Sequence, residues 1–244
     1  MLLNIWDTVL YQPLINALAF LVSIVPGGDV GLAVIILTIL VKLILFPLSQ
    51  KSIESQAEMN ILAPELNKIK ASGASKEEQA KQTFDLYKKH NTNPFSGCLL
   101  VLIQIPIIFA LYYVFIKGIN FDSGMLYSFV HVPDKINMVF LGLLDISNKG
   151  ILILAILAGI SQYLQAVTMP QPVPSTSPAV SGAFADTFAK SMQTQMKYFF
   201  PFLIAWIAYS VSGAVALYWI TSNLFMVAQQ IYVKKEKNFK IVIK

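Results

Sequence analysis

The 244-residue sequence is 56% hydrophobic and 13% charged, and its mean hydropathy is +0.63. A soluble domain carries about 25% charged residues, so this composition excludes an ordinary soluble protein and indicates a membrane protein. The net charge is +5, and the sequence contains lysine but no arginine, which argues against an Arg-rich organellar targeting segment. A single cysteine, Cys98, excludes an internal disulfide.

Residues 1–30 are predicted to form an extracytoplasmic amphipathic helix and a turn at the membrane interface. Polar residues recur at every fourth position, at Asn4, Thr8, Gln12 and Asn16, and so share one helical stripe. This pattern favours an interfacial helix. A spanning helix remains the alternative, because the segment is otherwise apolar.

Residues 31–48 form the first predicted span, and Lys42 is its one charged residue. Lys42 lies about 16 Å below Gly31, near the midplane of a hydrocarbon core of about 30 Å. A lysine at that depth costs about 2.5–3.5 kcal/mol, so we expect it to face the bundle interior or a hydrated pocket. Thr38 lies one turn earlier on the same face. The alternative is a lysine that snorkels to the inner headgroups.

Residues 49–95 are polar and charged and are predicted to form a cytoplasmic helical hairpin. Ser75 followed by Glu78 is a capping box for its second helix, and Ser72–Gly73 supplies the break before it. Pro64 is a candidate kink in the first helix. The apolar positions predicted to form the contact face of the hairpin are Met59, Leu62, Leu66, Phe84 and Tyr87.

The rest of the chain completes an all-α polytopic bundle of five transmembrane helices. The remaining predicted spans are 96–117, 149–169, 195–211 and 213–233. They are joined by an extracytoplasmic segment at 118–148 and a Pro- and Ser-rich cytoplasmic loop at 170–194, and followed by a basic cytoplasmic tail at 234–244. Within the extracytoplasmic segment, the apolar run 138–144 is too short to span and is expected to lie on or dip into the outer face of the membrane.

Lysines are concentrated in the hairpin at 49–95 and in the tail at 234–244. The positive-inside rule therefore places both in the cytoplasm and the N-terminus outside. A sixth span at the N-terminus would instead place both termini inside.

Polar residues on other predicted spans can share a pocket with Lys42. Gln104 lies in the second span, just before Pro106. The alternative for each polar residue is an interhelical hydrogen bond that only packs the bundle. In the last span, Tyr218, Ser222 and Gln229 share one face, and Trp219, Asn223 and Gln230 share the adjacent face.

Residue patterns of enzymes are missing from the sequence. The two histidines, His90 and His131, fall outside the predicted spans and cannot pair with a serine inside the membrane. The sequence has no paired intramembrane aspartates, no Cys/His metal cluster and no phosphate-binding loop. We therefore expect no catalytic residue, no metal and no cofactor.

Several short motifs, in a specific order, resemble the YidC family of membrane-protein insertases, which includes mitochondrial and thylakoid relatives. A basic residue precedes Phe46–Pro47–Leu48, and an Asn-Pro-Phe-Ser-Gly-Cys segment leads into Gln104–Ile105–Pro106. Near the C-terminus, Gly213 precedes Leu217–Tyr218–Trp219, and Gln229–Gln230 closes the last span. Each motif is weak alone, whereas their order and spacing along nearly the whole chain are specific.

The resemblance implies an insertase and folding chaperone of the bacterial cytoplasmic membrane that works without nucleotide hydrolysis. It implies a hydrophilic groove open to the cytoplasm and to lipid but closed outside. Its implied partners are newly made membrane proteins and the phospholipid bilayer, with the Sec translocon, the ribosome and signal-recognition targeting factors as candidates. The residues implied to form the groove are Lys42, Thr38, Gln104, Tyr218, Trp219, Ser222 and Asn223.

Three features depart from the family pattern. Most bacterial members have arginine where this chain has Lys42, and many have proline where it has Val211. No large outer domain precedes the core in this sequence. A channel or secondary transporter that uses Lys42 as an intramembrane site is the alternative function, and an intramembrane enzyme is a third class that lacks a nucleophile–base pair.

Overall fold

A computed structural model describes residues 6–90, 92, 96–116, 121, 124, 126–169, 191 and 194–242. These residues form a mostly helical fold, which confirms the predicted all-α class, together with one small β-hairpin. The elements are η1 (Asp7–Tyr11), α2 (Gln12–Ile24), η2 (Pro26–Gly28), α3 (Val30–Ile44), α4 (Phe46–Ile61), α5 (Ala63–Ala71), α6 (Lys76–Lys89), α7 (Ser96–Ile116), β1 (Val139–Phe140), β2 (Leu144–Asp145), α8 (Leu152–Thr168), η4 (Gln195–Phe199), α10 (Phe200–Ser210) and α11 (Gly213–Val242).

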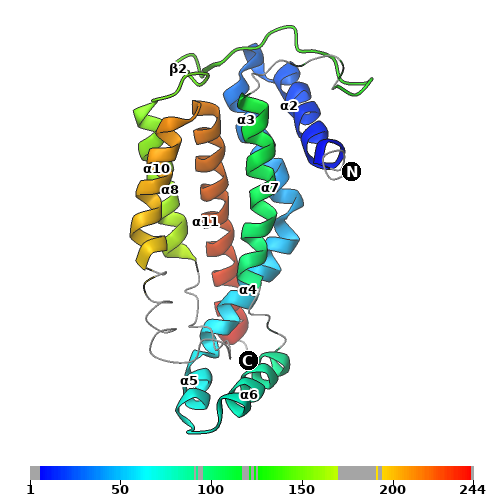
Figure 1. Cartoon of the computed structure of the whole chain (residues 1–244). Helices are drawn as coiled ribbons and strands as arrows, with labels where there is room; N and C mark the ends of the chain where they lie inside the picture. The colour runs from blue at the N-terminus through cyan, green and yellow to red at the C-terminus, as the bar shows by residue number, and fades with distance from the viewer. Residues whose placement is uncertain are drawn as a thin grey trace.

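Helix α11 runs through the middle of the bundle and contacts both α3 and α8 (Figure 1). Helix α10 packs against α8 at Gly159, where an added Cβ atom would lie 3.0 Å from the Ala205 Cβ and 3.1 Å from the Pro201 carbonyl oxygen. On the other side of α11, α2 packs against α3 and α7. The β-hairpin lies at one end of the molecule, the strand end, and α5 and α6 lie at the opposite end, the α5–α6 end (Figure 1).

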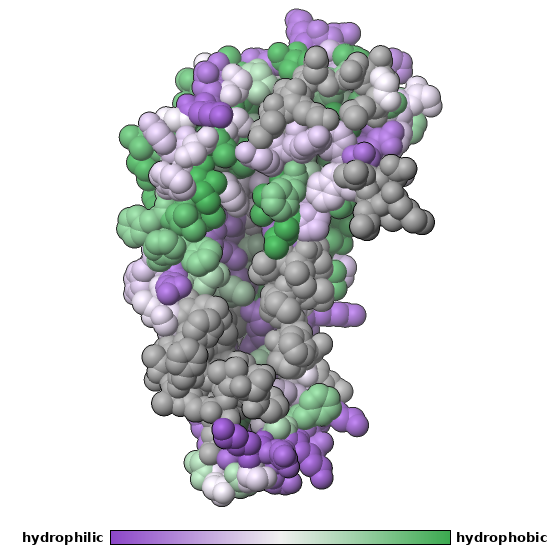
Figure 2. Space-filling model, viewed as in Figure 1, coloured by the Kyte–Doolittle hydropathy of each residue, from purple (hydrophilic) through white to green (hydrophobic). Residues whose placement is uncertain are grey.

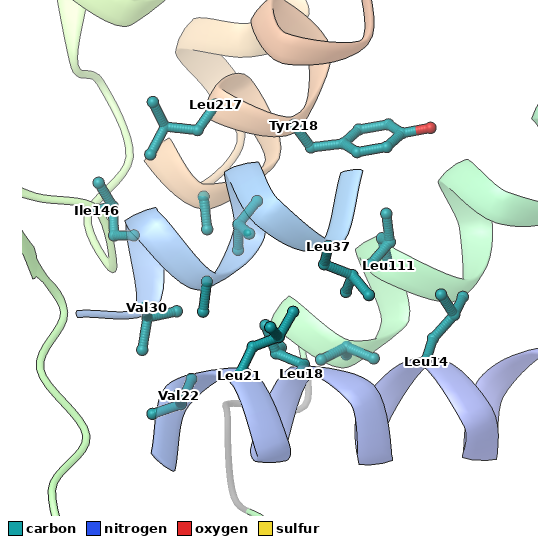
Figure 3. Close-up of a cluster of buried hydrophobic side chains, with 14 of the residues drawn as sticks. Leu14, Leu18, Leu21, Val22, Val30, Leu37, Leu111, Ile146, Leu217 and Tyr218 are labelled. Atoms are coloured by element: carbon teal, nitrogen blue, oxygen red, sulfur yellow. The ribbon is translucent and has the colours of Figure 1, made fainter. Parts of the chain in front are cut away.

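The core near the strand end is apolar. Leu18 from α2 and Val34 from α3 are almost completely buried, and Leu111 from α7 and Leu217 from α11 pack into the same cluster (Figure 3). Small side chains such as Ala33 let the helix backbones approach closely. We call this cluster, with the helix segments around it, the apolar half.

The first predicted span is broken by a bend. Helix α3 ends at Ile44, and α4 begins at Phe46 with its axis turned by 64°. Pro47 explains the bend, because proline has no N–H to donate and its ring clashes with the carbonyl four residues earlier. The chain stays helical past Leu48 and changes direction at Leu45, and the span boundary at Leu48 stays a prediction.

The helical hairpin at the α5–α6 end has a small core of its own. Tyr87 and Leu86 from α6 pack against the other side of the hairpin, whereas Phe84 is 71% exposed. Phe84 therefore does not share the buried face of α6, which is formed by Thr83, Leu86 and Tyr87, and its predicted role as a contact residue stays a prediction. The buried apolar residues are Met59, Leu62, Leu66, Leu86 and Tyr87.

The local signals in this hairpin are confirmed. The Ser75 side chain accepts a hydrogen bond from the Glu78 N–H at 3.2 Å and caps α6. Gly73 has a φ of +70° in the break between α5 and α6. Pro64 lies in the first turn of α5, where the helix restarts after Leu62. The location of the hairpin in the cytoplasm stays a prediction.

Helix lengths do not decide how many times the chain crosses a membrane. Among the described residues, one run is straight, long and apolar enough, Asp7–Ile24, with 18 residues and a mean hydropathy of 1.3. Helices α3 and α4 pass the same criterion together but are bent, and Gln104–Val114 and α8 are shorter apolar stretches. Hydrophobic residues cover much of the surface between the two ends (Figure 2). The five-span organisation therefore stays a prediction.

The N-terminal segment packs along the strand-end part of α3 and α7 and does not extend to the α5–α6 end (Figure 1). Asn16 is buried, donates to the Gln12 carbonyl at 2.7 Å and accepts from the Tyr127 N–H at 2.6 Å. At least Asn16 of the predicted polar stripe therefore forms hydrogen bonds within the protein. Whether this helix is interfacial or spanning stays a prediction.

Candidate functional site

Beyond the apolar half, the side chains buried around α11 become polar. Ala214 and Leu217 pack in the apolar cluster, whereas Ser222, Gln229 and Gln230 are buried further along the same helix. Tyr218 marks the transition: its ring borders the leucine cluster and its hydroxyl points away from it (Figure 3). We call the buried polar residues from Tyr218 to Gln230, with their partners on α3, α4, α7 and α8, the polar half.

Lys42 is brought to this transition by α3 and is 8% exposed. Its Nζ donates to the Oε1 of Gln104 on α7 at 2.8 Å. The Gln104 Nε2 donates to the Tyr218 hydroxyl, and Ser222 hydrogen-bonds the same hydroxyl from one turn further along α11. Among the residues that the structure describes, no carboxylate forms an ion pair with Lys42. The cluster therefore holds a positive charge through neutral partners alone.

Two further residues of the predicted groove lie beside this cluster without bonding to it. The Thr38 hydroxyl is buried but donates to the Val34 carbonyl of its own helix at 2.7 Å. Trp219 is partly buried and packs against the apolar half. Of the seven predicted groove residues, Lys42, Gln104, Tyr218 and Ser222 thus form one hydrogen-bonded group.

Asn223 lies on a different side of α11. Its Nδ2 donates to the Ser161 hydroxyl at 3.2 Å and to the Gln162 Oε1 at 3.1 Å, both on α8. Further along the same interface, the Thr168 hydroxyl donates to the Gln230 Oε1 at 2.5 Å. The interhelical alternative considered for these residues fits Asn223 and Gln230.

The bend between α3 and α4 is also tied to α11. The Gln229 side-chain amide donates to the Phe46 carbonyl at 3.1 Å and is hydrogen-bonded to the Ser49 hydroxyl at 2.8 Å. Gln229 is 3% exposed, so this contact is buried. Figure 2 shows a narrow recess in the middle of the molecule, with hydrophilic residues on its floor.

Sequence reasoning missed the polar residues of α8. Ser161 and Gln162 follow ten mostly apolar residues, and Gln165 and Thr168 repeat three residues apart. This spacing places Ser161, Gln165 and Thr168 on one helix face, a signal that could have identified the side facing α11. Ser161 is 2% exposed.

At the strand end, the β-hairpin caps the first turns of α3 and α11. The carboxylate of Asp29, which is 5% exposed, accepts from the Leu32 N–H at 3.1 Å and from the Leu141 N–H at 2.7 Å. The Ile146 carbonyl accepts from the Ala214 N–H at 3.2 Å. These bonds satisfy amides at the helix starts that lack intrahelical partners.

Two glycines make room for this cap. A Cβ atom on Gly31 would lie 2.3 Å from the Phe140 ring, and one on Gly213 would lie 3.0 Å from the Ile146 Cα. The hairpin therefore fits tightly between the starts of α3 and α11. No group of three or more His, Cys, Asp or Glu residues suited to a metal occurs in the described part of the chain.

Comparisons with known proteins match nearly the whole chain. The model of the 60Kd inner membrane protein family matches residues 20–240. A Fusobacterium nucleatum protein named membrane protein insertase YidC is 33% identical over 231 residues, which cover 93% of this chain and 98% of the relative. A Clostridium acetobutylicum protein of the same name is 38% identical over 224 residues, covering 86% and 76%. A Francisella tularensis subsp. novicida relative of that name is 32% identical over 205 residues, covering 83% and 32%.

Proposed function

Because the chain belongs to the family of the 60Kd inner membrane protein and the YidC insertases, we propose that it inserts membrane proteins through its polar half. Membership confirms the resemblance inferred from the motifs and supports a role as a membrane insertase in a bacterial inner membrane. The observation that carries the mechanism is the buried Lys42–Gln104–Tyr218 group at the boundary with the apolar half.

The proposed arrangement has five spans, with the strand end outside and the α5–α6 end in the cytoplasm. The segment of α11 from Gly213 to Val233 is about 30 Å long at 1.5 Å per residue, which matches a hydrocarbon core. The α5–α6 end carries exposed lysines at positions 51, 68, 76, 81, 88 and 89, which fits the positive-inside rule.

A substrate with one apolar helix must move a polar segment across hydrocarbon. Each unsatisfied polar group costs several kcal/mol in lipid. The polar half supplies hydrogen-bonding partners over the cytoplasmic part of that path, and the charge of Lys42 attracts acidic groups to its end. Burial of the substrate's own helix in lipid then drives the step without nucleotide hydrolysis.

The apolar half supports the other requirement, that the path be closed on the outer side. Leu18, Val34 and Leu111 contribute only hydrocarbon side chains to that region, and the β-hairpin covers the starts of α3 and α11. A polar path that ends halfway shortens the dry crossing without opening a pore for ions.

The α5–α6 hairpin is the proposed contact for incoming chains or for the Sec translocon, ribosome or targeting factors. Four of its five predicted contact residues, Met59, Leu62, Leu66 and Tyr87, are used in its own core. Phe84 is exposed and lies between exposed Lys81 and Lys88 on α6, so it is the apolar residue of this set that is free to meet a partner.

The test is insertion of a single-span substrate with an acidic outer tail into liposomes that contain this protein alone. Lys42→Ala is expected to lower insertion about tenfold, which corresponds to a loss of about 1.4 kcal/mol of attraction between the lysine charge and the acidic tail. Lys51→Ala is the matched control, since Lys51 is exposed on α4. Full insertion by Lys42→Ala would refute the role of Lys42.

A neutral-tailed substrate and an ion-flux measurement complete the experiment. The neutral tail should depend less on Lys42, because it lacks the charge that Lys42 attracts. Lysine-dependent ion or solute flux in the same liposomes, without insertion, would favour the channel or transporter alternative.

A further inference from the structure

The β-hairpin at the strand end is fixed at a defined height on the bundle. Asp29 is the N-cap of α3, and its second carboxylate oxygen accepts from the Leu141 N–H at 2.7 Å. The Val30 N–H donates to the Asn137 carbonyl at 3.0 Å, and the Asn137 N–H donates to the Gly28 carbonyl at 2.9 Å. The tip of the hairpin is therefore held one hydrogen bond away from the first turn of α3.

The hairpin buries one group of its apolar side chains and exposes another. One set, Phe140, Leu144 and Ile146, packs against the apolar half. Leu141 and Leu143 lie in the turn between β1 and β2 and are 57% and 81% exposed. Val139, on β1 opposite Asp145, is 38% exposed.

An outward face made of Val139, Leu141 and Leu143 does not suit water. Antiparallel hairpins with one face on a core normally carry polar side chains on the other. The start of α8 also carries exposed apolar side chains, since Leu152 is 63% exposed and Ile153 is 55% exposed. Figure 1 places β2 above the ends of α8 and α10, at the edge of the bundle and not over its centre.

Polar groups begin immediately beyond this edge. Asp145 is exposed, and hydrogen bonds from the Ser147 hydroxyl and backbone N–H hold the pKa of its carboxyl below the usual range. Asp145 is therefore charged at neutral pH and belongs in water. An apolar tip next to a charged base is the pattern of a segment that sits at a membrane interface.

We propose that Val139, Leu141 and Leu143 form a lipid-binding edge that inserts into the bilayer leaflet at the strand end. The occupant is the acyl-chain region just below the headgroups, because hydrogen bonds fix the edge at the level where the apolar helix α3 begins. Immersion of this edge holds the cap over α3 and α11 at a constant depth. The inference concerns lipid contact and does not depend on which substrates are inserted.

The test uses the full chain in phospholipid vesicles with Cys98→Ser as the background. An environment-sensitive dye is attached in turn to Leu143→Cys and to Lys149→Cys, an exposed control position in the same segment. The dye at 143 should be quenched by lipids with nitroxides on their acyl chains, and quenching by iodide on both sides should be at least about threefold weaker than at 149, because the edge is immersed. Equal iodide quenching at both positions, without nitroxide quenching, would overturn the proposal.

A second variant excludes immersion caused by the dye itself. With the dye at Val139→Cys, the double substitution L141S/L143S should remove at least about half of the nitroxide quenching, because polar serines weaken partitioning into lipid. Unchanged quenching in L141S/L143S would show that the leucines do not hold the edge in lipid and would refute their role. The dye at 149 should respond in the same way in both backgrounds, which verifies that the segment remains folded.

Discussion

The apolar half and the polar half are built on the same helices but solve opposite problems. In the first turns of α11, Ala214 and Leu217 pack among hydrocarbon side chains, whereas Ser222 and Gln229 are buried two to four turns later through hydrogen bonds. The apolar half gains stability from the close packing of hydrocarbon side chains. The polar half keeps groups that hydrocarbon would exclude, each with a partner. The contrast shows that the polarity of a buried side chain depends on its position along the length of the bundle and not on which helix carries it.

The largest expected effect comes from moving the charge along one helix face. Val34 and Lys42 lie two turns apart on α3, and Val34 is 1% exposed in the apolar half. Val34→Lys should destabilise the protein by about 3 kcal/mol or more, because the ammonium is buried without a partner such as Gln104. Thermal unfolding in bicelles measures the effect.

Lys42→Met is the matched substitution in the polar half. It should change stability by less than about 1 kcal/mol, because loss of the hydrogen bond is offset by relief of a buried charge. Equal destabilisation by the two substitutions would contradict the division of the bundle into two halves.

The cap at the strand end should give a smaller effect. Asp29→Ala removes the acceptors of both Leu32 and Leu141 and is expected to cost about 1–2 kcal/mol. Asp29→Asn keeps one carbonyl oxygen and should cost about half as much. Asp134→Ala, at an exposed aspartate in the same region, is the control and should leave the unfolding temperature unchanged.

If Asp29 mattered to stability alone, proton leak through vesicles that contain Asp29→Ala would equal that of the parent protein. A raised leak would show that the cap also contributes to closure of the strand end. This readout separates the seal from the stability of the helix start.

The smallest effect is expected at the α8–α11 interface. Asn223→Leu removes the hydrogen bonds to Ser161 and Gln162 and should cost about 0.6 kcal/mol, the average for such bonds between membrane helices. Insertion should be retained, because Asn223 does not bond to the Lys42 group. Gln104→Leu, which removes the partner of Lys42, should lower insertion of acidic-tailed substrates, and comparison of the two variants checks which polar contacts serve the substrate.

Local chemistry was predictable from the sequence where one segment determines it. The Ser75 cap depends on residues three apart, and the seam of Met59, Leu62 and Leu66 depends on helical spacing, so both were found. The spacing that gives Phe84 and Tyr87 one helix face did not predict that only Tyr87 is buried, because the burial of Thr83 and Leu86 sets the rotation of α6. The sequence of α6 alone does not determine this rotation, because the rotation depends on packing against the partner helix.

The sequence predicted which polar residues belong to the candidate site, but not which neighbouring helix each of them bonds to. Lys42, Gln104 and Tyr218 were expected to share a pocket, and the structure joins them by hydrogen bonds. Asn223 was expected in the same pocket, but its side chain bonds to Ser161 on α8, because helices on both sides of α11 set the rotation of α11. The role of Asp29 was missed because one of its partners, Leu141, lies 112 residues away in the chain.

The hydrogen bonds around Gln104 have a direction that follows from the chemistry of lysine. An ammonium can only donate, so the Gln104 oxygen must face Lys42 and its NH₂ group must face Tyr218. The Tyr218 oxygen is then an acceptor, and its own proton remains available to Ser222 or to another acceptor that enters the polar half. A fixed positive charge on α3 thereby orients a row of dipoles across α7 to α11, and carbonyl or carboxylate oxygens arriving there meet a hydrogen atom and not a lone pair.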